Sequence, residues 1–320
     1  MDEFELIERF FSPPNTDPSV LVPVGDDGAV LSPDANRDLV CVVDTLVEGV
    51  HFPTDLGAAE VAHRLLGANL SDIAAMGARP RWMTLSLSMP RADDRWLRAF
   101  SAGLYESASP FGVTLVGGDT TRSEQTVVSL QIIGDVQRGE CLRRGGAAIG
   151  DEIFVSGHLG EAAAGLKLLL DGKAESTGER RLVARFCRPT PRVALGQSLV
   201  GLASAAIDIS DGLCGDLAKL VAASGCGAEL HADKLPISED LLMVAPREEA
   251  QLLALTGGED FELCFSVPPR RAGVLPTMAH GHGVSLTRVG TVVSGAGVAV
   301  LDNGQPIAVD AGGFRHFEQL

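Results

Sequence analysis

The chain has 320 residues, of which 45% are hydrophobic, so it can bury a large core and fold as two domains or one large one. Its 42 acidic residues outnumber its 26 basic residues, which gives a formal net charge of −16. This charge argues against a protein that binds nucleic acid or an anionic membrane surface.

The cysteines and the N-terminal segment indicate a cellular location. Six cysteines lie far apart and form no Cys-x-x-Cys pair, so we expect buried free thiols rather than a zinc site or a disulfide framework. The segment 1–11 is acidic and amphipathic and lacks the basic flank and apolar core of a signal peptide. No apolar run approaches the length of a membrane span. These features predict a soluble protein of a reducing cytoplasm.

Hydrophobic spacing predicts a mixed α/β structure for the first half of the chain. Apolar residues in 4–11 follow a helical spacing that Ser12-Pro13-Pro14 ends. A Val-rich strand is predicted to end at Asp44, and another strand to break at Gly117-Gly118-Asp119. In chain order, the predicted elements after the first helix are strands at 20–24, 29–31 and 39–43, a helix at 58–76, a strand at 82–89, a helix at 93–109, and strands at 113–116 and 126–134.

A change of composition separates the two halves. Residues 139–150 are rich in Arg, Gly and Ala, which indicates a domain crossing and places the domains at 1–140 and 141–320. Both halves contain an apolar strand followed by Asp, a pattern that two related α/β halves would share. The elements predicted for the second half are strands at 152–156, 205–209, near 228, and at 261–267, 285–293 and 298–301, helices at 160–170, 193–202 and 213–224, and a turn at 188–192.

Acidic residues recur beside small residues along the whole chain. A carboxylate at the end of an apolar strand is costly to bury alone and normally has a cation, a donor or water beside it. Carboxylate oxygens are the ligands that Mg²⁺ prefers, and Mg²⁺ often bridges substrate phosphates. We therefore predict a ring of carboxylates that holds divalent metal at a phosphoryl-transfer site. The acidic segments are Gly25-Asp26-Asp27-Gly28, Asp44 with His51 downstream, Asn69 to Asp72, Gly117-Gly118-Asp119, Asp208 to Gly212, and Gly257 to Asp260.

Each motif also has a purely structural interpretation. Gly25–Gly28 has the composition of a surface turn, Ser210-Asp211-Gly212 that of a helix N-cap, and Gly257–Asp260 that of a hairpin turn. Asp72 could be a solvated helix residue and His51 a hydrogen-bonded loop residue. Neither a P-loop nor a Rossmann glycine fingerprint occurs. A bound nucleotide would therefore depend on metal ions, arginine and backbone N–H groups.

Taken together, the motifs resemble those of the thiamine-monophosphate kinases. The resemblance runs from the first helix to Gly313-Phe314 near the end, and the Gly-Gly-Asp and Asp-x-Ser-Asp-Gly motifs are shared with the wider superfamily of aminoimidazole-ribonucleotide synthetase. It depends on Gly25-Asp-Asp-Gly-Ala, Asp44-Thr-Leu-Val-Glu-Gly-Val-His-Phe, Asn69-Leu-Ser-Asp-Ile-Ala-Ala-Met-Gly-Ala, Gly117-Gly-Asp-Thr-Thr-Arg, Ala206-Ile-Asp-Ile-Ser-Asp-Gly-Leu and Gly257-Gly-Glu-Asp-Phe-Glu-Leu.

The resemblance implies a fold, an activity and a set of roles. It implies a two-domain α/β fold whose N-terminal domain pairs sheet against sheet in a homodimer and whose C-terminal domain closes over the nucleotide. It implies ATP- and Mg²⁺-dependent phosphorylation of thiamine monophosphate to thiamine diphosphate by direct in-line transfer. The implied Mg²⁺ ligands are Asp27, Asp44, Asp72, Asp119 and Asp208, with Asp211 for a further ion. The implied nucleotide contacts are Gly118, Asp119, Arg144, Ser210 and Tyr105, and the implied substrate contacts are His51, Glu259 and Phe314. Of these, Asp44, Asp72, Asp119 and Arg144 are the implied catalytic residues.

Two places depart from the family pattern or leave alternatives open. The family usually has hydroxyl residues before the strand-end Asp, whereas this chain has Val42-Val43, so Val43 would contact metal through its carbonyl or a water. Either Arg143 or Arg144 could reach the phosphate, and Tyr105, the only tyrosine, could instead belong to the core.

The rival interpretations are a sister enzyme of the superfamily and a non-catalytic sensor. Selenophosphate synthetase would need a reactive N-terminal cysteine with a lysine, a setting that Cys41 lacks. The hydrogenase-maturation branch would need a C-terminal cysteine, whereas this chain ends in His-Phe-Glu-Gln-Leu. The presence of every metal-matching Asp argues against a sensor that kept only the fold.

Overall fold

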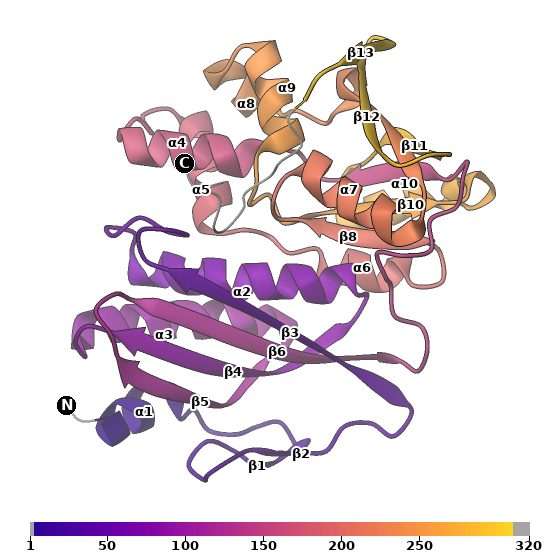
Figure 1. Ribbon diagram of the computed structural model, residues 1–320. Coiled ribbons are helices and arrows are strands. Elements are labelled where there is room, and N and C mark those ends of the chain that lie inside the picture. Colours follow the sequence, from indigo (N-terminus) through magenta and orange to yellow (C-terminus); the bar gives the residue numbers. More distant parts are fainter. Residues whose placement is uncertain (1–2, 310–320) are drawn as a thin grey trace. The chain divides into compact units, whose positions relative to one another are not determined.

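The structure, a computed structural model, describes residues 3–309 and divides into two compact units (Figure 1). The first unit contains the described residues up to Ile73 together with Ala78–Gly139. The second contains Ala74–Gly77 and the described residues from Glu140 onward. Both units combine helices with a β-sheet, which confirms the mixed α/β prediction. None of the helices within 3–309 is long and apolar enough to cross a membrane.

A four-stranded sheet forms the centre of the first unit. Its strands, in spatial order, are β3 (Arg37–Val47), β6 (Val127–Gln137), β4 (Arg79–Met89) and β5 (Thr114–Arg122). β6 is antiparallel to both neighbours, whereas β5 runs parallel to β4. Helices α2 (Ala58–Ala75) and α3 (Asp94–Ala108) cover one face, and β1 (Val20–Val22) with β2 (Val30–Leu31) lies on the other (Figure 1). A short 3-10 turn, η1 (Ser109–Phe111), follows α3.

The sheet is longer than the sequence predicts in two strands. β3 continues to Val47, so Asp44 lies within a strand and not at its end. β5 likewise continues through Gly117-Gly118-Asp119, which was predicted as a break. In both cases a neighbouring strand accepts and donates the backbone hydrogen bonds, as β6 does along eleven paired positions of β3. The tertiary pairing therefore overrides the local tendency of Gly and Asp to end strands.

Helix α1 (Glu3–Phe11) and the β1–β2 segment pack beside this sheet. Phe11 of α1 lies edge-on to Phe100 of α3, with 6.4 Å between the ring centroids. Val20 of β1 packs against Trp82 and Val116 on the sheet face that α2 and α3 leave open. The loop between β1 and β2 carries Asp26 and Asp27, so this packing places those residues near the edge strand β5.

The second unit is built on a seven-stranded sheet. The pairs of strands are antiparallel except for β12 and β9. Two neighbouring strands at one end of this sheet are buried throughout, in all five residues of β8 and all six of β10. The spatial order is β13 (Gln305–Ile307), β12 (Gly297–Asp302), β9 (Gly227–His231), β11 (Leu286–Val293), β7 (Glu152–Ser156), β10 (Glu262–Val267) and β8 (Ala205–Ile209).

The second unit contains four helices that the sequence analysis did not predict. They are α5 (Thr177–Cys187), α8 (Glu239–Val244), α9 (Arg247–Thr256) and α10 (Leu275–His282). A sequence signal for α5 exists, because Ser176 and Glu179 form a capping box at its start. The other elements of this unit are α4 (Glu161–Asp171), α6 (Val193–Leu199), α7 (Leu213–Ser224) and the 3-10 turns η2 (Ala232–Lys234) and η3 (Pro269–Val274).

All six cysteines are free thiols, as predicted, but they are not all buried. Cys187, Cys214, Cys226 and Cys264 are buried, whereas Cys41 is exposed and Cys141 is half-buried. Cys41 is exposed because it alternates along β3 with Val40 and Val42 and therefore points to the open face of the sheet.

Candidate functional site

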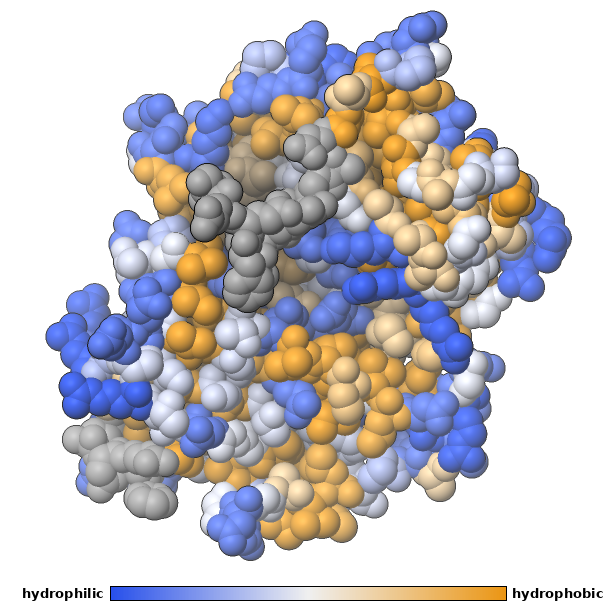
Figure 2. All heavy atoms as spheres, viewed as in Figure 1, coloured by the Kyte–Doolittle hydropathy of each residue, from blue (hydrophilic) through white to orange (hydrophobic). Residues whose placement is uncertain are grey.

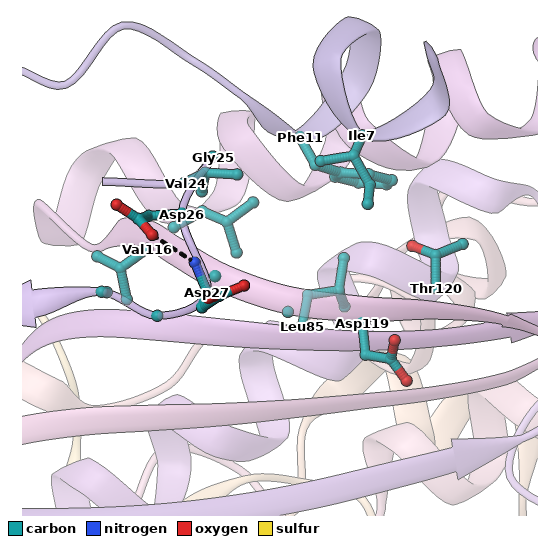
Figure 3. A pocket seen from close by; sticks show the side chains of 15 residues that line it. Ile7, Phe11, Val24, Gly25, Asp26, Asp27, Leu85, Val116, Asp119 and Thr120 are labelled. Carbon is teal, nitrogen blue, oxygen red and sulfur yellow. Dashed lines mark hydrogen bonds between the residues drawn. The ribbon is translucent and has the colours of Figure 1, made fainter. Parts of the chain in front are cut away.

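A cavity of about 390 Å³ lies along the edge strand β5 of the first unit (Figure 3). Ile7 and Phe11 of α1 form one side, the β1–β2 loop forms another, and β5 forms the floor. Figure 3 shows Leu85 and Thr120 pointing toward α1, whereas Asp119 points to the other side of the strand. The full lining is Ile7, Phe11, Val24 to Ala29, Leu85 and Leu115 to Thr120.

Two of the predicted metal ligands, Asp27 and Asp119, line this same cavity. Both residues are exposed, and they come from segments about ninety positions apart in the sequence. Mg²⁺ is commonly bound by one or two carboxylates together with waters and substrate phosphates. The Asp119 carboxylate points to the other side of β5, however, so the two carboxylates do not converge within the cavity (Figure 3).

Gly118 lets β5 approach its neighbour closely. A Cβ atom at this position would lie 2.0 Å from the carbonyl oxygen of Leu85, so no larger residue fits without a shift of the strand. A register irregularity between β4 and β5 occurs at Met83 and Thr84, close to this contact. Close packing against Leu85 therefore explains why a glycine occupies the position before Asp119.

The remaining predicted residues of the first unit lie outside the cavity lining. Asp44 is half-buried on β3, on the same face as the buried Val40 and Leu46, and Val43 next to it points to the open face. Asp72 is half-buried near the end of α2. Across residues 3–309 no three Asp, Glu, His or Cys side chains are grouped as a metal centre.

His51 is held in a defined tautomer by the loop that follows β3. The backbone N–H of Val47 donates to Nδ1 of His51 at 3.1 Å, so the proton of the neutral ring is on Nε2. The buried Arg64 donates to the carbonyl of His51 at 3.1 Å.

Tyr105 has a partner within the fold. Its hydroxyl donates to the carbonyl of Phe10 at 3.1 Å and so joins α3 to α1. Burial raises the pKa of this hydroxyl well above its usual value. This placement favours the core role of Tyr105 over a nucleotide contact.

Two loops of the second unit lie directly against each other. The N–H of Glu259 donates to the carbonyl of Ser210 at 2.8 Å, and the N–H of Phe261 donates to that of Ile209 at 2.9 Å. A Cβ at Gly258 would lie 2.6 Å from the Ser210 carbonyl oxygen. The structure thus brings together Ser210, Asp211 and Glu259, which the sequence analysis had assigned to nucleotide, metal and substrate.

Lys219 and Asp216 complete this pair of loops, and the sequence analysis missed both. The buried Asp216 accepts the N–H groups of Ser210 at 3.0 Å and Asp211 at 2.9 Å. The ammonium of Lys219 lies 2.6 Å from the Asp211 carboxylate and 2.8 Å from that of Asp216. One ammonium group therefore pairs with both carboxylates. The spacing of Asp216 and Lys219 by three residues on one helix was the available signal.

Asp208 lies on β8, whereas the two candidate arginines lie beside the beginning of that strand. Asp208 is buried in the middle of the strand, opposite Leu263 of β10. The carbonyl of Arg143 accepts the N–H of Ala206, so Arg143 and Arg144 lie beside the beginning of the strand, and both are exposed. Phe314 lies outside the described residues.

Family models and individual relatives of known function both match this chain over most of its length. The family described as AIR synthase related protein matches with its N-terminal domain over residues 25–136 and with its C-terminal domain over residues 148–303. A thiamine-monophosphate kinase of Salmonella typhimurium is 42% identical over 319 residues, which cover 98% of each chain.

Solved structures agree with this result. The crystal structure of thiamine-monophosphate kinase from Stenotrophomonas maltophilia is 42% identical, with a TM-score of 0.89 over 96% of this chain and 98% of that one. A structure described as AaThiL complexed with AMPPCP and TMP is 33% identical, with a TM-score of 0.77 over 86% of both chains. This chain therefore belongs to the thiamine-monophosphate kinase family of AIR synthase related proteins.

Proposed function

We propose that the protein is a kinase that transfers the γ-phosphoryl group of ATP to the phosphate of thiamine monophosphate. The products are thiamine diphosphate and ADP, and the reaction belongs to thiamine diphosphate biosynthesis. The observation that carries the proposal is the 42% identity to a thiamine-monophosphate kinase over nearly the whole of both chains. The related structure that contains AMPPCP and TMP supports this pair of substrates.

The proposal gives each acidic motif a task. In the first unit, Asp27 and Asp119, which both border the cavity along β5, are proposed Mg²⁺ ligands, and Asp44 and Asp72 are further proposed ligands. In the second unit, Asp208 and Asp211 are proposed metal ligands, with Ser210 and Arg144 as nucleotide contacts. His51 and Glu259 are the proposed contacts of thiamine monophosphate, and Gly118, whose close packing against Leu85 excludes a larger residue, is a proposed nucleotide contact.

The chemistry requires charge neutralisation more than proton transfer. The attacking oxygen belongs to a phosphate monoester whose second pKa is about 6, so it is largely deprotonated at neutral pH and needs no strong general base. When bound, Mg²⁺ ions supply the positive charge that lets two anionic phosphates approach. His51 is proposed to add an N–H donor from Nε2, because its Nδ1 already accepts a hydrogen bond. This scheme has no covalent phosphoenzyme.

The protein is also proposed to be a cytoplasmic homodimer. The open face of β3 supports a dimer, because Leu39, Cys41 and Val43 are exposed in a row along it, with Leu39 49% and Val43 62% accessible. Figure 2 shows hydrophobic atoms over this part of the first unit. A hydrophobic row on an edge strand is a surface that proteins usually cover.

The experiment is a coupled measurement of both products. Purified protein is incubated with ATP and Mg²⁺, with and without thiamine monophosphate, and ADP and thiamine diphosphate are quantified. We expect both products in equal amounts and only when thiamine monophosphate is present. Asp119→Asn should reduce turnover at least about a hundredfold through loss of electrostatic stabilisation. Glu124→Gln, on the nearby loop after β5, is the control and should leave turnover unchanged.

Two other outcomes would contradict the kinase. ADP without thiamine diphosphate would indicate a sister enzyme with another acceptor. If neither product forms while calorimetry detects binding of both ligands, the protein is a sensor.

A further inference from the structure

The turn that carries Glu259 has an unusual backbone. Among the described residues, only Glu259, Phe261 and Asn303 are non-glycine residues with positive φ, and the values for Glu259 and Phe261 are 74° and 50°. The left-handed region costs free energy for any residue with a Cβ atom, and most for a bulky one such as Phe. Two strained residues thus flank one residue, Asp260. Such strain persists only where surrounding contacts hold it.

Asp260 makes the side-chain contacts that fix this turn to the start of α4. Its side chain is buried, and its carboxylate accepts the N–H of Gly160 at 2.6 Å and that of Ala162 at 3.1 Å. These groups belong to the start of α4, about a hundred residues earlier in the chain. On the other side, the N–H groups of Glu259 and Phe261 are bound by the carbonyls of Ser210 and Ile209. The turn is therefore fixed between α4 and the end of β8.

A second buried acid fixes the chain two residues later. Glu262 is fully buried and accepts a hydrogen bond from the hydroxyl of Ser156. It also accepts hydrogen bonds from the guanidinium group of Arg185 at 2.9 Å and from Nε of Arg192 at 2.6 Å. Asp260 and Glu262 are thus both anchored inward, whereas Glu259 is half-buried and lies against Ser210.

A simple helix cap would not require this arrangement. Gly160 at the N-cap of α4 has no side chain, so Asp260 does satisfy N–H groups that would otherwise lack a partner. However, a cap residue on a relaxed loop would serve equally well, and the strain falls on Glu259 and not on α4.

We propose that Asp260 is a positioning residue, which ties the turn to the start of α4 and so holds Glu259 in the left-handed conformation that meets thiamine monophosphate. The inference rests on the proposed function, since it assigns Glu259 to that substrate. It adds a residue that touches neither substrate and acts only through its neighbour.

The test is a double-mutant cycle between Asp260→Asn and Glu259→Gln. An asparagine in place of Asp260 can accept only one of the two N–H groups, and its NH₂ group would face the other one. For each variant, KM for both substrates, kcat, and the Kd of thiamine monophosphate by calorimetry are measured. Asp171→Asn, an exposed acid at the far end of α4, is the matched control and should behave as the wild type.

We expect Asp260→Asn to raise the KM and Kd of thiamine monophosphate about tenfold or more, with the KM of ATP changed less than about twofold. In the Glu259→Gln background, Asp260→Asn should have little further effect, because its action passes through Glu259. The inference would be overturned if the effects of the two substitutions on the KM of thiamine monophosphate multiplied, or if Asp260→Asn raised the KM of ATP as much as that of thiamine monophosphate.

A milder variant covers the case in which Asp260→Asn does not fold. Ala162→Pro removes one of the two donors to Asp260 at a first-turn position, where proline is tolerated, and should raise the KM of thiamine monophosphate selectively. Unchanged kinetics in that variant would contradict the inference. A wild-type protein without kinase activity would overturn the proposed function and the inference together, whereas an active wild type with a multiplicative cycle would overturn the inference alone.

Discussion

Asp260 and Asp135 show how the partners of a single buried residue set its charge. Burial raises the pKa of Asp260 to about 7, although two backbone N–H groups at the start of α4 oppose that shift, and the nearby Glu262 adds to it. Burial also acts on Asp135, but hydrogen bonds from Arg79, Arg81 and Arg37 outweigh it and lower the pKa of that carboxyl. The pKa values of these two buried aspartates are therefore shifted in opposite directions.

The raised pKa of Asp260 predicts a pH-dependent stability. In the unfolded chain its pKa is about 3.9, so the folded state holds the proton more tightly. The stabilisation is complete below about pH 4 and is lost as the pH rises to about 7, by up to about 1.4 kcal/mol per pH unit. Asp260→Asn removes this titration. In urea unfolding followed by far-UV circular dichroism, the stability of the wild type relative to the variant should fall between pH 5 and 7 and level off above that. A difference that is constant with pH would disprove the assignment.

At the scale of elements, one serine attaches the β1–β2 segment to the sheet. The hydroxyl of Ser19 accepts hydrogen bonds from Trp82 Nε1 and from Arg81, both at 3.1 Å, and donates to Asp17 at 2.6 Å. Trp82 is fully buried under Val20 of this segment, and its indole is stacked beneath the Arg81 guanidinium. The loop with Asp27 therefore depends on a polar anchor and an apolar contact at the same place.

Ser19→Ala should loosen that segment selectively. It leaves the buried indole N–H without its acceptor, which costs about 1–3 kcal/mol, while Arg81 keeps its contact with Asp135 at 2.8 Å. We expect faster hydrogen exchange for residues 20–31, little change in β3 and β6, and a higher Mg²⁺ concentration for half-maximal turnover. Ser123→Ala, at an exposed loop, is the control. Uniformly faster exchange across the sheet would show that Ser19 has no specific role in this segment.

At the scale of the whole molecule, the exposed face of β3 bears on the proposed homodimer. The wild type should sediment at twice 33.4 kDa. Val43→Lys places a charge in the middle of the hydrophobic row and should shift the protein toward the monomer, because a buried unpaired charge is costly. Met243→Lys alters another exposed apolar residue, 85% accessible, and should leave the sedimentation unchanged. A wild type that is monomeric at micromolar concentration would refute the dimer.

Much of this protein follows from local sequence patterns. The periodicity of residues 58–76 and 82–89 predicted α2 and β4 to within a few residues, because burial of one face depends only on residues near in sequence. The order of the acidic motifs was sufficient for the family, since each motif is short and contiguous. The capping box at Ser176 and Glu179 contained enough information for α5 as well, although the periodicity around it did not reveal that helix.

Tertiary structure decided what depends on distant partners. Asp44 and Gly118 lie inside strands because β6 and β4 supply their backbone hydrogen bonds, and no local pattern encodes that pairing. Asp27 and Asp119 share a cavity only because Trp82 and Val116 hold the β1–β2 segment against the sheet. The sequence could identify Asp260 as one more acid in a turn. The fold places Asp260 against Gly160 and Ala162, about a hundred residues away in the sequence. Its burial, its raised pKa and its proposed positioning role all depend on that contact.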